Sequence, residues 1–169
     1  MPYSEDMRTL AEIAIALAGF AGVVLAIRSR RAIRDQKVNQ ARLRELLVTS
    51  FIVVFFAFFP PLMTGVLGDS PWAWRGPMLI FALAHLAALL SFMLAVGKEG
   101  SSDFSLAEWL SLPGAAVVIF LQFATAFGYF PDYVPEIYLL ALLWFLLIAA
   151  MNFGVLLIRD DGSETETPG

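Results

Sequence analysis

Apolar residues fall into five long blocks along the chain, and short polar connectors separate the blocks. A helix rises 1.5 Å per residue, so about 20 apolar residues cross the roughly 30 Å of hydrocarbon in a bilayer. Each block has about that length. The pattern therefore predicts an all-α integral membrane helical bundle with five transmembrane helices, over residues 10–27, 46–67, 77–96, 112–130 and 137–158.

The connectors contain residues that are typical of membrane interfaces and helix ends. Trp72 and Trp74 lie in the connector 68–76, where an interfacial aromatic belt is expected. Ser105 and Glu108 have the spacing of a capping box, so we expect a short interfacial helix within the polar segment 97–111. The remaining polar segments are the N-terminal residues 1–9, the basic loop 28–45, the turn 131–135 and the acidic tail 159–169.

Prolines bear on the second and third predicted helices. Pro60 and Pro61 lack backbone N–H groups, and we expect them to kink the second helix or to end its regular part. Pro77 suits the first turn of the third helix, where an N–H would have no helical partner.

The composition agrees with lipid as the solvent for most of the chain. Hydrophobic residues make up 59% of the 169 residues, charged residues make up 15%, and the mean hydropathy is +0.75. A water-soluble protein of this size could not bury so much apolar surface. The chain has no cysteine, which excludes disulfides, thiolate metal sites and thiol nucleophiles.

Basic residues are concentrated between the first two blocks. Seven of the eleven Lys and Arg residues lie there: Arg28, Arg30, Arg31, Arg34, Lys37, Arg42 and Arg44. Loops rich in Lys and Arg stay in the cytoplasm, so we predict that the N-terminus is outside and the C-terminus inside. Acidic residues precede the first block and basic residues follow it, the reverse of a signal peptide, so we expect this block to be retained. A four-helix alternative makes it a peripheral arm, because Glu12 and the glycines make it the least hydrophobic block.

The basic loop has three interpretations. The first is that its charge only sets the topology, and the second is that it binds anionic lipid headgroups. The third is that it docks an acidic cytoplasmic partner or nucleic acid. No aromatic residue interleaves the arginines, so we do not expect nucleic-acid binding.

Residues 10–24 (LAEIAIALAGFAGVV), together with the arginine-rich loop that follows, resemble the start of a group of small uncharacterised bacterial multi-pass membrane proteins. The resemblance covers about the first quarter of the chain. It implies a location in the bacterial inner (cytoplasmic) membrane and no particular activity.

Ionisable and small residues in the first predicted helix form one candidate site. Glu12 lies in the first turn and heads a narrow face that includes Gly19 and Gly22 at helical spacing. Such a face either packs closely or lines a path, and in an oligomer a ring of Glu12 would attract cations. The simpler interpretation is an interfacial carboxylate that the helix dipole stabilises at the N-terminus.

Polar residues in the other predicted helices form a second candidate site. His85, the only histidine, lies near the middle of the third helix and needs a hydrogen-bond partner there. Gln122 and Asn152 either hydrogen-bond between helices or converge with His85 on a hydrated cavity. A metal ion would need more ligands at one depth, so we expect no metal and no cofactor. Nucleotide-binding and hydrolase motifs are absent, and we expect neither catalytic residues nor an enzyme.

Small residues recur along the first, third and fifth predicted helices and favour close helix contacts, which predicts a homo-oligomer. Our leading functional hypothesis is a self-associating membrane bundle with a pore or solute-path role. The alternative is an accessory or sensory subunit that recruits a cytoplasmic partner or anionic lipid through the basic loop.

Overall fold

The computed structural model describes residues 3–28, 36–99 and 106–158, and over these ranges the chain is helical except for short turns. No strand occurs within these three ranges, which confirms the all-α class. The elements in chain order are α1 (Ser4–Arg28), α2 (Gln36–Leu67), α3 (Trp72–Glu99), α4 (Leu106–Ala126), the 3-10 turn η2 (Pro131–Tyr133) and α5 (Val134–Ile158).

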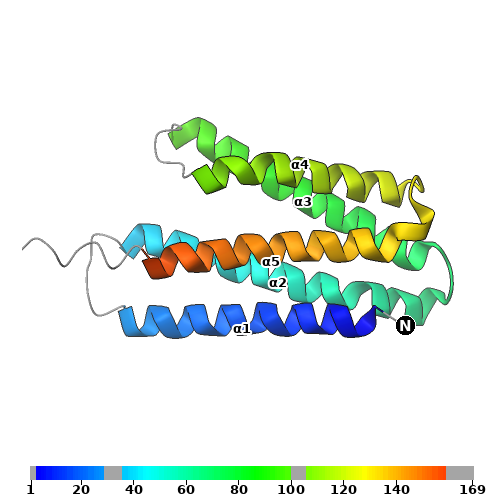
Figure 1. Cartoon of the computed structure of the whole chain (residues 1–169), viewed down its shortest axis with the longest axis horizontal. Helices are drawn as coiled ribbons and strands as arrows, with labels where there is room; N and C mark the ends of the chain where they lie inside the picture. Colours follow the sequence, from blue (N-terminus) through cyan, green and yellow to red (C-terminus); the bar gives the residue numbers. More distant parts are fainter. Residues whose placement is uncertain (1–2, 29–35, 100–105, 159–169) are drawn as a thin grey trace, which may run out of the picture.

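The helices form an antiparallel bundle with α5 in its middle (Figure 1). α1 packs against α2 and α5, and α4 packs against α3 and α5. Tyr3, the α2–α3 turn around Ser70 and the start of α5 at Val134 line one shared cavity, so all three lie at the same end of the bundle. We call this the Tyr3 end. Because α3 leaves the Tyr3 end and α5 starts there, α4 has to run back along the bundle.

Four helices are long and apolar enough to cross a membrane, which supports the prediction of a membrane-embedded bundle. The helix that falls short is α4, whose apolar part covers only Ser111–Ala126. The first helix is not a peripheral arm, because Met7, Ala11 and Ala14 are buried in the main core. The four stretches that qualify are Ser4–Val24, Leu46–Leu67, Trp72–Leu94 and Pro131–Gly154.

Several helices begin earlier than the apolar blocks. α2 starts at Gln36, inside the segment that we expected to be a loop. α3 starts at Trp72, so Pro77 lies beyond the first turn. α4 starts at Leu106 and continues to Ala126 as one helix, in place of a separate short interfacial helix. Polar residues such as Gln, Lys, Arg and Glu are good helix formers, so a helix can continue past the end of its apolar part.

The proline pair does not end α2, which continues through Pro60 and Pro61 to Leu67. Pro60 has no N–H, so the carbonyl of Phe56 loses its usual donor four residues later. The hydroxyl of Tyr138, on α5, donates to this carbonyl at 2.7 Å. The hydroxyl of Thr64 donates to the carbonyl of Pro60, also at 2.7 Å. A neighbouring helix thus supplies the hydrogen bond that the proline removes.

Aromatic rings fill the half of the bundle nearer the Tyr3 end. The rings of Phe56 and Phe81 stack with centroids 4.3 Å apart, and Phe81 also contacts Tyr138 and Phe145. Trp74 adds an edge-to-face contact with Tyr138. We call these five residues the aromatic column. At the same end, the hydroxyl of Tyr3 donates to Glu136 at 2.5 Å and joins the start of α1 to the start of α5.

The opposite half is packed differently. Its buried cluster among the described residues is small and consists of Ala21 and Leu46, with Phe153 packed against them. In Figure 1, the paired helices α3 and α4 diverge from α5 toward this end.

Candidate functional site

A buried polar pair lies at the end of the aromatic column that is farther from Tyr3. His85, on α3, is 3% exposed, and Gln122, on α4, is fully buried. The Nδ1 atom of His85 lies 3.0 Å from the Oε1 atom of Gln122. Because Oε1 only accepts hydrogen bonds, Nδ1 must donate, and in the neutral ring Nε2 then carries a lone pair. The ring of His85 also meets the ring of Phe145 edge to face at 4.6 Å.

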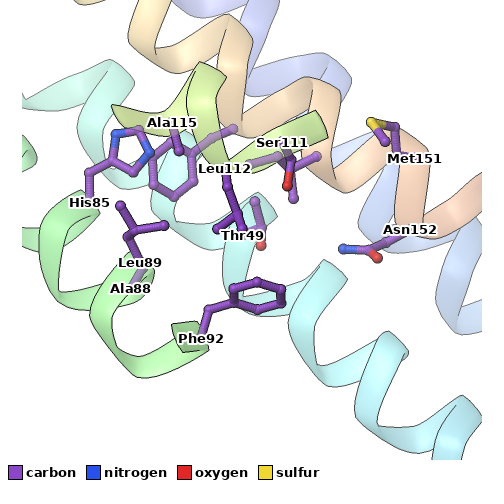
Figure 2. Close-up of a pocket in the computed structure, with 12 residues that line it drawn as sticks. Thr49, His85, Ala88, Leu89, Phe92, Ser111, Leu112, Ala115, Met151 and Asn152 are labelled. Atoms are coloured by element: carbon purple, nitrogen blue, oxygen red, sulfur yellow. The ribbon is translucent and has the colours of Figure 1, made fainter. Parts of the chain in front are cut away.

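A cavity of about 160 Å³ begins at His85 (Figure 2). Its polar lining comes from four helices: Thr49 on α2, His85 on α3, Ser111 on α4 and Asn152 on α5. Its apolar lining consists of Ala88, Leu89, Phe92, Leu112, Ala115, Phe145, Ile148 and Met151. None of the described residues around the cavity carries a charge at neutral pH when His85 is neutral.

The position of the cavity along the helices shows which end it approaches. Phe92, Ser111 and Asn152 each lie within about two turns of the helix end farthest from Tyr3. His85 is at the deep end, next to Phe145 of the aromatic column. The cavity therefore extends from the middle of the bundle toward the end where residues 29–35 connect α1 and α2.

Two small residues keep the space open. Ala88 and Ala115 line the cavity from α3 and α4, and Figure 2 shows the His85 ring directed toward the side of Ala115. A larger side chain at either alanine would occupy the cavity. Directly before Ala115 on α4, Gly114 allows the indole of Trp144 to lie where a Cβ atom would otherwise be.

In the described part of α4, two buried polar atoms lie without partners, one in Gln122 itself and one in Thr125. The amide Nε2 of Gln122 and the hydroxyl of Thr125, one turn later on α4, have no hydrogen-bond partner among the described residues. Both side chains are fully buried. Buried polar groups are normally paired with protein or with an ordered molecule, so this part of α4 has unused hydrogen-bonding capacity.

The two candidate sites from the sequence do not meet. His85 forms a hydrogen bond with Gln122 between α3 and α4 and shares a cavity with Asn152, whereas Gln122 is not part of that cavity's lining. Glu12 instead lies on the exposed surface of α1 and forms an ion pair of 2.9 Å with Arg8. This geometry favours the interpretation of Glu12 as an interfacial carboxylate.

The predicted packing face of α1 is exposed. Gly19 and Gly22 have exposed surfaces, and a Cβ atom added at either would meet nothing within 4 Å. The face is therefore free to meet lipid or another chain. A homo-oligomer stays a prediction.

The basic segment lies largely outside the described part of the chain. Arg30, Arg31 and Arg34 fall in the undescribed residues 29–35, and only the backbone is described at Arg28, Lys37 and Arg42. Arg44 is exposed. Binding of anionic lipid headgroups or of a cytoplasmic partner through this segment stays a prediction.

Sequence reasoning missed Thr49 and Ser111 as cavity residues. Ser and Thr occur at many positions in membrane helices, where their hydroxyls bond to the helix's own carbonyls, so neither residue stands out.

Among the described residues, no group of three or more His, Asp or Glu is placed to hold a metal ion. Comparisons of the chain with protein-family models, with curated proteins and with solved structures found no match.

Proposed function

We propose that this chain is a five-span protein of the bacterial inner membrane that binds a small solute in the cavity at His85. The proposed topology places the Tyr3 end outside and the basic segment inside, in agreement with the charge distribution. The cavity is then entered from the cytoplasmic end. In this proposal, the solute path is a binding site within a single bundle that is open to one side of the membrane only.

The fifth span in this proposal is α4. Its apolar part is short, but the whole helix has 21 residues and a length of about 31 Å, close to the hydrocarbon thickness. The chain leaves α3 at one end of the bundle and enters α5 at the other. We therefore propose that α4 crosses the membrane and connects the end of α3 to the start of α5.

The observation that carries the proposal is the placement of a buried histidine in the lining of a mostly apolar cavity that three other polar residues also line. Polar side chains inside a membrane are costly and commonly mark binding sites and solute paths. Cavities of about 150 Å³ are large enough for a benzene-sized molecule, and this cavity has about 160 Å³. The lining combines apolar walls with a few convergent polar groups, which is typical of small-molecule sites.

The aromatic column makes the site one-sided. Phe81 and Phe145 are in ring contact on the side of His85 that faces the Tyr3 end, and both are buried. A solute that reaches His85 from the cytoplasmic end therefore meets closed packing beyond it. Passage to the other side would require these rings to move.

The binding test uses the single histidine as the reporter. Because His85 is the only histidine, chain labelled with ¹³C,¹⁵N-histidine in lipid nanodiscs gives one imidazole spectrum. We expect at least one of toluene, anisole and phenol to shift this spectrum saturably. Ala88→Phe should abolish the shift by filling the cavity. The matched control Ala87→Phe, at an exposed neighbour that does not line the cavity, should leave it unchanged.

Two results would overturn the binding proposal. The first is the absence of a saturable shift with all three probes in the parent chain. The second is an equal shift in the parent and in folded Ala88→Phe, since the probe would then be reaching His85 through lipid and not through the cavity.

The topology has its own test. The chain contains no cysteine, so single cysteines can be introduced at Asp69, in the α2–α3 turn, and at Arg34. A membrane-impermeant maleimide should label Asp69→Cys in intact cells and Arg34→Cys only after the membrane is opened. The reverse pattern would contradict the proposed orientation.

A further inference from the structure

We propose that the cavity selects an uncharged molecule that carries a hydrogen-bond donor, and that this donor binds the Nε2 atom of His85. This inference rests on the proposed function and adds the chemical class of the ligand. It joins three observations: the hydrogen bond to Gln122, the contacts of the imidazole ring and the absence of charge in the described lining of the cavity.

The hydrogen bond to Gln122 fixes which ring nitrogen carries the proton. The amide oxygen Oε1 accepts from Nδ1 at 3.0 Å, which leaves Nε2 as an acceptor in the neutral imidazole. Gln122 is fully buried, so water does not compete easily for its oxygen. Gln122 is thus a positioning residue that presents the lone pair of His85.

Within the described part of the chain, the imidazole ring has a hydrogen bond to Gln122 and a ring contact with Phe145. The first uses Nδ1 and the second uses the ring edge or face, so neither supplies a donor to Nε2. The ring lines the cavity, and Figure 2 shows it directed toward Ala115, which also lines the cavity. A ligand in the cavity therefore meets an acceptor at the deep end.

The described lining has no charged group to neutralise an ion. Its walls near His85 are Leu89, Leu112 and Phe145, and the remaining polar groups are hydroxyls and the amide of Asn152. Moving an unpaired charge into such a site costs several kcal/mol, whereas a neutral molecule incurs only the cost of its polar atoms. The cavity therefore excludes ions and favours a compact apolar body with one donor.

Phenol, anisole and benzylammonium separate these properties on one ring size. Phenol is neutral and donates, anisole is neutral and only accepts, and benzylammonium donates but is charged. In the parent chain, we expect phenol to bind about fivefold to tenfold tighter than anisole, the factor for one hydrogen bond, after correction for partition into lipid. Benzylammonium should bind at least about tenfold more weakly than phenol.

The ¹⁵N spectrum of His85 tests the mechanism directly. In the parent, Nδ1 should show a bound proton and Nε2 none, and phenol should move the Nε2 resonance while anisole leaves it nearly unchanged. In Gln122→Leu the tautomer is no longer fixed, so the preference for phenol over anisole should fall below about twofold. If this variant does not fold, the parent spectra still decide between the outcomes.

The possible results separate this inference from the proposed function. If none of the uncharged probes binds, the proposed function fails and the ligand class fails with it. If phenol and anisole bind equally, or the proton is found on Nε2, the cavity is a binding site but the donor class is wrong. If benzylammonium binds as tightly as phenol, the exclusion of charge is wrong.

Discussion

The contact between Tyr138 and the proline-containing part of α2 leads to a quantitative prediction. Tyr138 is fully buried, and its hydroxyl is the donor to the Phe56 carbonyl that Pro60 leaves without a helical partner. Tyr138→Phe retains the ring, so its packing on Phe81 persists, but a buried carbonyl becomes unpaired. We expect a loss of about 1–2 kcal/mol in the free energy of unfolding, a factor of about 5 to 30 in the equilibrium.

A second substitution tests the cause. Pro60→Ala restores an N–H that can donate to Phe56, so in that background the hydroxyl of Tyr138 is redundant. Tyr138→Phe should then cost less than about 0.5 kcal/mol, which gives a coupling energy of about 1 kcal/mol. Tyr133→Phe removes the same atom from an exposed side chain and should have no measurable effect.

The assay is reversible unfolding in mixed micelles with increasing dodecyl sulfate, followed by the fluorescence of the four tryptophans. All four variants of the cycle are measured at one lipid-to-detergent ratio. An equal cost of Tyr138→Phe in the two backgrounds would refute the reasoning, because the hydroxyl would then stabilise the bundle independently of the missing N–H.

Three further predictions use the same unfolding assay. Gly114→Ala should cost about 1–3 kcal/mol, because the new methyl group overlaps the Trp144 indole across the α4–α5 interface, whereas Gly19→Ala should cost nothing. Gly128→Ala should cost at least about 1 kcal/mol, because residue 128 has a φ of 94° in the turn after α4. The hydrogen bond to Glu136 raises the pKa of the Tyr3 hydroxyl, so the protonated form is favoured in the folded state. The stability difference between parent and Tyr3→Phe should therefore be full below the usual tyrosine pKa of about 10 and should disappear as the pH rises through the raised pKa.

The helices were largely predictable from the sequence, since a helix in lipid has to satisfy its own backbone and therefore needs a long apolar run. Helix starts were less predictable. Gln36 begins a helix in a segment that we expected to be a loop, and Leu106 begins one where we expected a separate short helix. A change from apolar to polar residues marks the membrane boundary, but the backbone hydrogen bonds of the helix can continue beyond it. At Pro60, the hydrogen bond that the helix lacks comes from Tyr138, which is 82 residues away from Phe56 in the chain.

Some residues of the candidate site were predictable from the sequence, but Thr49, Ser111 and the arrangement of the site were not. His85, Gln122 and Asn152 are recognisable because polar groups are rare and costly within apolar blocks. Which of them meet depends on how α3, α4 and α5 are rotated about their axes, which spacing within one helix does not determine. The same limit explains Glu12 and Gly19, whose spacing indicates a common face but not whether that face points inward.

The location of the cavity follows from how side-chain volume changes along the bundle. Lipid tails are as apolar as Leu, so apolar side chains gain little by leaving lipid, and helices associate through packing. Near the Tyr3 end, Phe81 and Phe145 fill the interior and hold the helices in contact. Beyond His85, the cavity-lining residues Ala88, which is exposed, and Ala115, which is buried, are too small to do so, and no hydrophobic force comparable to that in water closes the space. His85 lies where large rings give way to small residues, so the only histidine is placed where the bundle changes from closed packing to an accessible cavity.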